Sequence, residues 1–419
     1  MHILIIPSEE YLPINNHTSG IFQKHQAIAL KNAGCRIGIL SIKQSLSVPM
    51  LLKGMLSRFF SININNELRD KKIVSLIRLL FQKIFNLSRF ITTENIDGII
   101  VYRIDGFFYF PPSKHTNHYG WLQAGNHLWK RYSSVVGSPD IIHAHNAVYA
   151  GLLAKDISKK TGIPYCITEH SSYIARDIES KFIKNKIKSA YHQANSLFVV
   201  SNFLGEKLDQ FFKTNKKWKL VPNVLDSEIE EAPYQVDVMP TRPFIFINIA
   251  SLIPLKRQQD LINAFHKKFS TDKDVRLVIG GEGELKHQLQ EQIHRLQLSK
   301  QIQLTDRLTR QDVLKLIDSS HCLILCSQIE TFGVVLIEAL SRGKPIIATK
   351  CGGPESIVNE ENGILCPAND TDALADAMKQ MINKYIDYSN ENIRKDAISR
   401  FGQKTIANTL IKEYEAIIS

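Results

Sequence analysis

The chain has 419 residues, of which 44% are hydrophobic, so it is long enough for two or three domains with buried cores. Six scattered cysteines show neither the spacing of a zinc site nor that of a secreted disulfide framework, which indicates buried thiols in a reducing, cytoplasmic setting. The first residues form an apolar run that ends at Pro7 and do not resemble a signal peptide. No stretch reaches the roughly 18 apolar residues of a membrane span, which argues against an integral membrane protein.

The net charge of +11 is confined to the first half of the chain. Residues 1–235 hold 29 Lys and Arg against 18 Asp and Glu, whereas residues 236–419 hold 23 of each kind. A basic half suits an anionic membrane, an anionic substrate or a nucleic acid. The chain contains no nucleic-acid-binding motif, so we expect no nucleic-acid partner.

The chain opens with an alternation of strand and helix. Residues 3–6 are a short apolar run typical of a buried strand, residues 21–33 have helical periodicity and end at Gly34, and residues 37–40 form the next strand. A polar loop that ends in Gly20 joins the first strand to the helix. A strand–helix–strand unit of this kind predicts a parallel sheet.

Residues 45–95 interrupt this alternation. Residues 51–60 are rich in large apolar side chains, and residues 71–90 combine apolar residues at spacings of three and four with a basic face. Two interpretations stay open: a pair of helices that pack on the sheet, or a surface that docks on an anionic bilayer. The excess positive charge in this half of the chain favours the second.

Two histidines stand at the end of a later strand. Residues 140–145 are a predicted strand that ends in His143 and His145, which are two residues apart and therefore point to the same face. Ligands bind outside the carboxyl ends of parallel strands, so this position is a candidate site. A metal would need a third ligand, and none is obvious. The other elements predicted in this half are strands at 98–103, 164–168 and 197–200 and helices at 147–160 and 202–212.

An acidic stretch without clear periodicity, residues 228–239, is interpreted as the linker to a second domain. In that domain Gly281-x-Gly283 follows a predicted strand, but Lys286 stands where a dinucleotide-binding fingerprint has its third glycine, which disfavours a dinucleotide oxidoreductase. The elements predicted in this half are strands at 244–250, 275–280, 302–304 and 322–325 and helices at 258–269, 334–340, 376–382 and 405–418.

The junction between the strand at 322–325 and the helix at 334–340 is a candidate anion site. Gly333 allows close backbone approach, and the free amides and the dipole of the helix start favour a negative group. Glu330 precedes the helix and Glu338 lies about five residues inside it, so the two carboxylates bracket a phosphate-sized slot. The alternative is a buried strand and an ordinary helix that carries two solvated glutamates.

The run from 326 to 345, with Glu-x7-Glu, Thr-Phe-Gly and Gly-Lys-Pro, resembles the signature of the retaining glycosyltransferases of family 4. Gly352-Gly353-Pro354-Glu355 and Asn362-Gly363 extend the resemblance. It implies an α/β protein with two Rossmann-like, doubly wound parallel-sheet domains, the GT-B fold, and a cleft between them. We expect an acceptor-binding domain at 1–235 with the insert 45–95, a nucleotide-sugar-binding domain at 236–400, and a helix at 401–419 that crosses back to the first domain.

The resemblance also assigns roles to individual residues. It places His145, in the run Asp-x-x-His-x-His, at the reaction centre, Lys256 on the donor diphosphate, Glu330 on the donor sugar and Glu338 on the ribose. We therefore expect His145, Glu330 and Lys256 to be catalytic. Ser251 stands where the family commonly has an arginine, and the neighbouring Arg257 is the candidate replacement for that cation. The further donor-binding positions that it implies are Gly20, Arg307, Leu308, Thr331, Phe332, Gly333 and Val334.

We therefore expect a metal-independent retaining glycosyltransferase that needs no cofactor and moves a sugar from a nucleotide diphosphate sugar to a saccharide or lipid-linked acceptor. Synthesis of a cell-surface polysaccharide, such as lipopolysaccharide, O-antigen or exopolysaccharide, is the expected setting, in the cytoplasm or on the cytoplasmic face of the membrane. Two rivals stay open: a nucleotide-sugar epimerase of the same fold, which turns over donor without acceptor, and a non-catalytic nucleotide-sugar-binding subunit.

Overall fold

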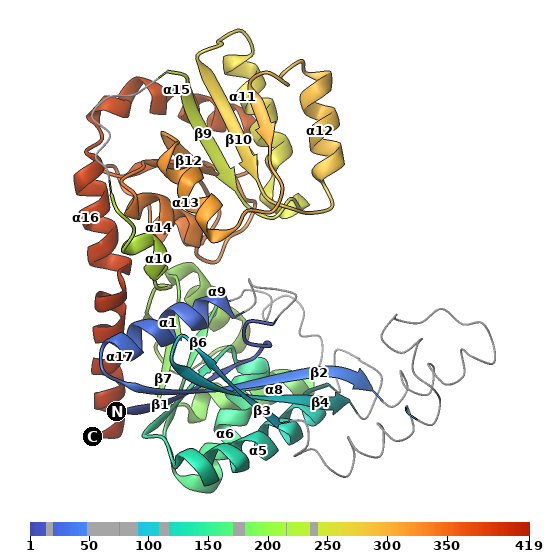
Figure 1. Ribbon diagram of the computed structural model, residues 1–419, viewed down its shortest axis with the longest axis vertical. Coiled ribbons are helices and arrows are strands. Elements are labelled where there is room, and N and C mark those ends of the chain that lie inside the picture. Colours follow the sequence, from blue (N-terminus) through green and yellow to red (C-terminus); the bar gives the residue numbers. More distant parts are fainter. Residues whose placement is uncertain are drawn as a thin grey trace, which may run out of the picture. The chain divides into compact units, whose positions relative to one another are not determined.

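The computed structural model describes residues 1–13, 20–47, 75, 91–108, 117–170, 181–214, 216–234 and 242–419. The chain divides into two compact units, each of which is an α/β structure (Figure 1). Unit 1 consists of Met1–Val199, Gly205–Val221 and Ala407–Ser419, and unit 2 consists of Val200–Leu204 and Pro222–Ile406. The segments expected as helices at 51–60 and 71–90 lie outside the described residues, apart from residue 75.

Unit 1 is built on an eight-stranded sheet with the strand order β3-β4-β2-β1-β5-β6-β7-β8. Its strands are β1 (His2–Pro7), β2 (Arg36–Ser47), β3 (Ile91–Ile96), β4 (Ile99–Phe108), β5 (Ile141–His145), β6 (Tyr165–Glu169), β7 (Ser196–Val199) and β8 (Lys219–Leu220). Its helices are α1 (Ile21–Asn32), α5 (Asn117–Val136), the π-helix η2 (Ala147–Gly151), α6 (Leu152–Thr161), α8 (Lys181–Gln193), most of α9 (Asn202–Phe212) and most of α17 (Gln403–Ile418).

The strand order of unit 1 reverses at β1. Successive parallel strands run outward from β1 through β2 to β4 on one side, and from β5 through β8 on the other. Such a reversal is a topological switch point, where loops at the carboxyl ends diverge and leave room for a ligand. In unit 1 this point lies between Pro7 of β1 and His145 of β5, which are direct partners in the register.

Strand β3 is an antiparallel edge strand, and most of it falls within the expected insert 45–95. It pairs with β4 from Ile91 opposite Ile104 to Ile96 opposite Ile99. Asp97 and Gly98, which join the two strands, both have positive φ angles, 51° and 74°. This is the backbone of a tight hairpin turn, and Asp-Gly is the dipeptide that favours it.

Unit 2 is built on a six-stranded parallel sheet with the order β11-β10-β9-β12-β13-β14. Its strands are β9 (Phe244–Ile249), β10 (Val275–Gly280), β11 (Ile302–Leu304), β12 (Cys322–Leu325), β13 (Ile346–Lys350) and β14 (Gly363–Pro367). Its helices are α10 (Ser227–Glu230), η3 (Pro254–Lys256), α11 (Gln258–Phe269), α12 (Lys286–Arg295), α13 (Arg310–Asp318), α14 (Val334–Ser341), η4 (Gly353–Ser356), α15 (Thr371–Lys384), η5 (Tyr385–Asp387) and α16 (Asn390–Phe401).

The order of unit 2 also reverses, with the switch point between β9 and β12. Two parallel, doubly wound sheets confirm the fold class that the sequence predicts. The close approach of the loops after β9 and β10 depends on glycine: a Cβ at Gly281 would lie 2.0 Å from the carbonyl oxygen of Ala250, and one at Gly283 would lie 2.3 Å from that of Leu252. These two glycines therefore serve loop packing in unit 2.

Residues 222–234, expected in the first domain, belong to unit 2. Backbone and side-chain bonds hold them there: the Leu225 amide donates to the carbonyl of Phe401, and Arg342 donates to the carbonyls of Ala232 and Pro233. At the other end of the chain, Ala407–Ser419, which includes most of α17, belongs to unit 1, and Tyr414 is fully buried.

Candidate active site

The predicted donor residues of unit 2 gather at its switch point. The loop after β9 carries Lys256 in η3, and the loop after β12 carries Glu330. The two loops are joined by a bond from the Gln328 amide to the carbonyl of Leu255, 2.8 Å, and by Cys326 Sγ, which lies 3.2 Å from the carbonyl oxygen of Lys256. The fold therefore brings together residues that are 74 positions apart in the sequence.

Lys256 and Glu330 form an ion pair in which Lys256 Nζ donates to Glu330 Oε2. The other carboxylate oxygen accepts from the Thr331 amide at 3.2 Å. Both side chains are largely buried but still reach solvent, with 24% and 18% of their surface exposed. The backbone of Glu330 is held by the loop after β13, because its amide donates to Cys351 and its carbonyl accepts from Gly353. A ligand at this point meets a cation and a carboxylate side by side.

Helix α14 is preceded by its N-cap residue Gly333, which has the left-handed φ of 94° that the predicted junction requires. The amides of Val334 and Val335 lie in its first turn, where an α-helix has no internal acceptors for them. The side chain of Phe332 is buried and packs edge-on against Phe401, so Phe332 can offer a ligand only its backbone. Thr331 is anchored through its carbonyl, which accepts from Ser201 Oγ at 2.6 Å.

Glu338 lies one turn further along α14, with only 6% of its side chain exposed. Its Oε1 accepts from Arg310 Nη2 at 2.8 Å, and the same guanidinium binds Asp226. Arg310 and Asp226 are absent from the sequence-based site. A capping box between Thr309 and Asp312 marks the helix start beside Arg310, but nothing local indicates its partners.

Arg257 and Ser251, two further positions expected to bind the donor, lie in or beside the loop after β9. Arg257 has a positive φ of 56° at the start of α11, and its Nε donates to Asp260 of the same helix at 2.6 Å. Its charge is therefore paired with Asp260, while 37% of its side chain stays exposed. Ser251 is exposed, and its carbonyl accepts from Gln258 at 3.1 Å.

The loop expected to seat the base follows β11. Arg307 is exposed, and the side chain of Leu308 packs over Gly280, where a Cβ would lie 2.6 Å from its Cδ1. Asp306 is ion-paired to Lys286, the residue that stands where a dinucleotide fingerprint has its third glycine. The structure thus explains Lys286 as part of a surface ion pair of unit 2.

In unit 1, the expected site residues lie at the other switch point. Gly20 has a φ of 76° directly before α1, and its amide lies 3.3 Å from Glu9 Oε1. A Cβ at Gly20 would lie 3.1 Å from backbone atoms of Tyr11 and Leu12, so the position requires glycine. Helix α1, which begins after Gly20, then provides Gln26, whose amide lies 3.0 Å from His143 Nδ1.

His143 and His145 point to the same face, as their spacing predicts, and their rings stack 4.6 Å apart. His170, which follows β6, extends the stack: its Nε2 lies 2.8 Å from His145 Nδ1, and its ring stacks on Phe22. Burial, together with the neighbouring imidazoles, lowers the pKa of His143 to about 3 and that of His145 well below its usual value. Both rings are therefore neutral near pH 7, and His170 is the outermost, partly exposed member.

Glu169 is a second residue that the sequence-based site omits. Its side chain is fully buried in unit 1, and Oε1 accepts from the Ala147 amide at 2.7 Å and from the Tyr191 hydroxyl at 2.8 Å. Burial raises the pKa of Glu169 to about 8, although these two hydrogen bonds act in the opposite direction. The residue orders the start of η2 next to the histidine stack.

The described residues also bear on metal binding and on membrane insertion. Within those ranges, no group of three or more His, Cys, Asp or Glu side chains is arranged to hold a metal ion. Asp370, of the pair Asp370 and Asp372, caps α15 by accepting from two of its amides. No helix in the described part of the chain is both long and apolar enough to cross a bilayer.

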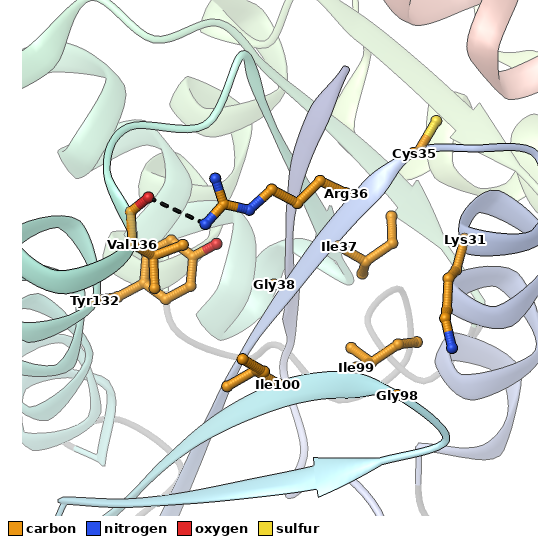
Figure 2. Close-up of a pocket in the computed structure, with 10 residues that line it drawn as sticks. All are labelled: Lys31, Cys35, Arg36, Ile37, Gly38, Gly98, Ile99, Ile100, Tyr132 and Val136. Carbon is orange, nitrogen blue, oxygen red and sulfur yellow. Dashed lines mark hydrogen bonds between the residues drawn. The ribbon is translucent and has the colours of Figure 1, made fainter.

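A pocket of about 270 Å³ lies at the amino ends of the strands in unit 1, away from the switch point (Figure 2). Its two cations stand at helix C-termini: Arg36 donates to the carbonyl of Val136, the last residue of α5, and Lys31 lies in the last turn of α1. Arg36 is accounted for by the partial negative charge at the end of α5, and Lys31 donates to the carbonyl of Asp97 in the turn between β3 and β4. The pocket is therefore not part of the candidate site.

Both halves of the chain are similar to known proteins. Residues 81–229 match the family model described as Glycosyltransferase Family 4, and residues 234–400 match the one described as Glycosyl transferases group 1. The chain is 29% identical to N-acetyl-alpha-D-glucosaminyl L-malate synthase of Bacillus anthracis, over 66% of this chain and 74% of that protein.

Two solved structures share the fold. Sucrose-phosphate synthase of Thermosynechococcus elongatus superposes with a TM-score of 0.68 at 14% identity, over 100% of this chain and 99% of that one. HepE of Anabaena in complex with UDP superposes with a TM-score of 0.66 at 18% identity, over 99% of this chain and 100% of that one. The chain therefore belongs to the family 4 glycosyltransferases and has their GT-B fold of two parallel-sheet α/β domains.

Proposed function

We propose that this glycosyltransferase moves a sugar from a nucleotide diphosphate sugar to a hydroxyl group of an acceptor, with retention of the anomeric configuration. The observation that carries the proposal is the gathering of a helix start, a lysine and two carboxylates at one switch point of unit 2. These groups could bind the diphosphate, the ribose and the sugar of such a donor.

The donor diphosphate is proposed to bind the first-turn amides of α14 and the ammonium group of Lys256, which offset its charge without a metal ion. Glu338 is proposed to accept hydrogen bonds from the ribose, and Glu330 from hydroxyls of the donor sugar. The UDP in the HepE complex makes uridine nucleotides the first donors to test.

The contacts of Glu330 suit a binding group better than a nucleophile. Each of its carboxylate oxygens already accepts one hydrogen bond, from Lys256 Nζ or from the Thr331 amide, which weakens it as a nucleophile and leaves each oxygen a second lone pair for a sugar hydroxyl. We therefore propose a front-face reaction in which the leaving phosphate accepts the proton of the acceptor hydroxyl. The groups around the diphosphate then act by stabilising the charge that develops on it. In unit 1, His145 and its neighbour His170 are the proposed side chains at the reaction centre.

The proposed acceptor is a saccharide or a lipid-linked intermediate of cell-surface polysaccharide synthesis, used in the cytoplasm. The test starts with a screen of UDP-, GDP- and ADP-sugars for a rise in melting temperature, because a ligand of the native state stabilises it. The stabilising donor is then incubated with saccharide acceptors and membrane lipid extract, and NMR of the product shows the anomeric configuration. An inverted product would refute retention, turnover of donor alone to an epimer would indicate an epimerase, and binding without turnover or hydrolysis would indicate a non-catalytic subunit.

A further inference from the structure

One guanidinium in unit 2 is shared between two buried carboxylates. Arg310, the first residue of α13, donates through Nε to Asp226 Oδ2 at 2.7 Å and through Nη2 to Glu338 Oε1 at 2.8 Å. Asp226 caps α10 with its other carboxylate oxygen, which accepts from the Glu228 amide at 2.9 Å. Glu338 is therefore tied through Arg310 to a residue 112 positions away in the sequence.

The three groups are buried to different extents. Only 6% of the side chain of Asp226 and of Glu338 is exposed, against 35% for Arg310. Burial alone would lower the pKa of Arg310, but the charges of Glu338 and Asp226 more than offset it and raise that pKa. One guanidinium thus contacts both buried carboxylates. Because Arg310 binds Oε1 of Glu338, Oε2 is the oxygen of that carboxylate that it leaves to accept from a hydroxyl group.

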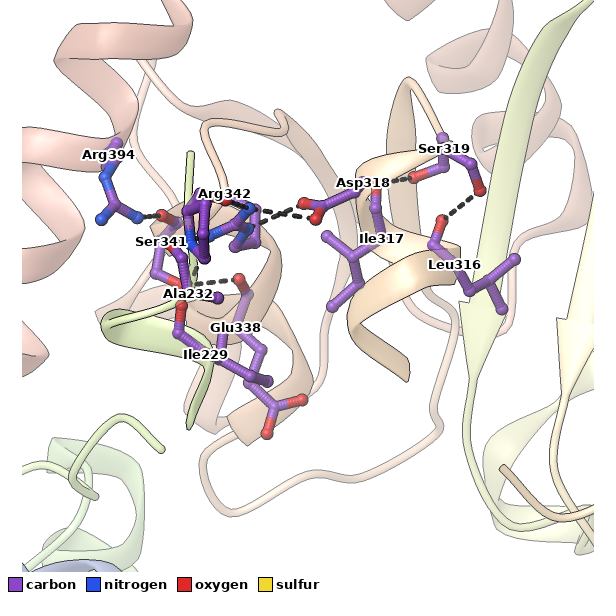
Figure 3. Close-up of polar contacts among 12 residues, drawn as sticks. Ile229, Ala232, Leu316, Ile317, Asp318, Ser319, Glu338, Ser341, Arg342 and Arg394 are labelled. Atoms are coloured by element: carbon purple, nitrogen blue, oxygen red, sulfur yellow. Dashed lines mark hydrogen bonds and ion pairs between the residues drawn. The ribbon is translucent and has the colours of Figure 1, made fainter. Parts of the chain in front are cut away.

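The helix that carries Glu338 is also held at its far end. Arg342, directly after α14, binds both carboxylate oxygens of Asp318 at the end of α13, at 2.7 and 3.0 Å (Figure 3). In Figure 3 the carboxylate of Glu338 points away from this contact. Two ion pairs of opposite polarity thus link α13 to α14, and they fix the backbone from which Glu338 extends.

We propose that Arg310 is a positioning residue for the ribose: it holds Glu338 with Oε2 presented to the ribose hydroxyls of a nucleoside diphosphate. The inference rests on the proposed function, since it takes the nucleotide to bind at α14. A guanidinium suits this role because its planar fork holds two carboxylates in a fixed geometry, which a lysine ammonium cannot do.

The experiment compares UDP, GDP and ADP with their 2′,3′-dideoxy counterparts by calorimetry, and uses inorganic pyrophosphate as a probe of the diphosphate contacts alone. We expect the wild type to bind one of the three nucleotides at least about tenfold more tightly than its dideoxy form, the effect of hydroxyl bonds to a charged acceptor. In Arg310→Gln this preference falls to within about threefold, whereas the affinity for pyrophosphate is unchanged. The matched control is Lys315→Gln, which removes an exposed cation from the same helix and keeps the full preference.

A double-mutant cycle separates positioning from a general loss of stability. If Arg310 acts through Glu338, adding Arg310→Gln to Glu338→Gln causes no further loss of nucleotide affinity. Arg310→Lys keeps a cation between the carboxylates, and it replaces Arg310→Gln in the binding comparison if Arg310→Gln does not fold. We expect its preference for the ribonucleotide to fall at least about threefold.

The outcomes distinguish the two proposals. A wild type that binds none of the three nucleotides overturns the proposed function and this inference together. A wild type that binds a nucleotide no more tightly than its dideoxy form overturns only the inference. So does an Arg310→Gln variant that keeps the full wild-type preference for the ribonucleotide. If Arg310→Gln does not fold, the same result in Arg310→Lys overturns the inference. An additive loss in the double mutant also overturns it, because Arg310 would then act independently of Glu338.

Discussion

Lys256 Nζ donates to Glu330 Oε2 across the switch point between β9 and β12. The cation proposed for the diphosphate and the carboxylate proposed for the donor sugar are thus in direct contact, and a donor that binds there meets both at once. Glu338, by contrast, is paired with Arg310. The two glutamates of the Glu-x7-Glu run therefore belong to different ion pairs, and their substitution should affect binding and turnover differently.

Glu338→Gln should lower the affinity for the free nucleoside diphosphate at least tenfold, because it weakens a charge-assisted bond worth about 1.5–3 kcal/mol. Glu330→Gln should leave that affinity within about threefold of the wild type and lower kcat instead, since its contact is to the sugar as the sugar departs. Calorimetry with the nucleoside diphosphate and steady-state kinetics with the donor measure the two effects. Equal losses of nucleotide affinity in both variants would contradict the assignment.

Transfer should persist in excess EDTA, because Lys256 and the start of α14 are proposed to offset the diphosphate charge. The rate is measured with and without chelator, and again after Mn²⁺ or Mg²⁺ is added back. The described Asp-x-Asp pairs have other roles: Asp272 accepts from the Asp274 amide at 3.1 Å, and Asp370 caps α15. A rate that collapses in chelator and returns with Mn²⁺ would show that the prediction is wrong.

The first half of the chain should bind anionic vesicles through the segment 51–90, whose basic face lies in residues 71–90. This prediction rests on the sequence alone, because the segment lies outside the described residues apart from residue 75. Each basic residue near an anionic surface contributes about 1 kcal/mol, so sedimentation with phosphatidylserine vesicles at low salt should be lost when Lys71, Lys72, Arg78 and Lys83 are replaced by Gln. The control removes the same charge from exposed lysines of unit 2, namely Lys273, Lys300, Lys315 and Lys379. A wild type that does not sediment would rule out the docking interpretation.

Glu169 should make the stability of the protein fall as pH rises. The pKa of its carboxyl is raised from 4.5 to about 8 in the folded state, so the unfolded chain releases the proton first, and stability is lost between about pH 4.5 and 8. Glu169→Gln keeps an acceptor for Ala147 and Tyr191 and removes this penalty, which is on the order of 4 kcal/mol at pH 8. The melting temperature of the variant, relative to that of the wild type, should therefore rise as the pH is raised from 5 to 8. The control is Glu206→Gln, which removes an exposed carboxylate of α9 and should show no such trend. If the melting temperatures of Glu169→Gln and the wild type differ by the same amount at pH 5 and pH 8, the prediction is refuted.

Local patterns in the sequence determine much of this fold. The helices at 202–212 and 258–269 and the strand at 275–280 are predicted with the bounds that the structure has, because periodic burial and glycine or polar ends are properties of adjacent residues. The left-handed Gly333 before α14 follows in the same way from a strand, a glycine and a helix in succession. Strand β3 was missed because four of its six residues are exposed, although Asp97-Gly98 carries a hairpin signal.

The sequence by itself thus determined the two parallel sheets, the family and the loops that carry the candidate site. Only the tertiary structure decided which side chains touch there: Lys256 with Glu330, Arg310 with both Asp226 and Glu338, and His170 with His145. It also buried the side chain of Phe332 against Phe401 and paired Arg257 with Asp260. The physical reason is that a strand or helix is set by its neighbours in sequence. An ion pair depends instead on where two separate loops meet at the edge of a sheet and on which partner offsets the desolvation of a buried charge.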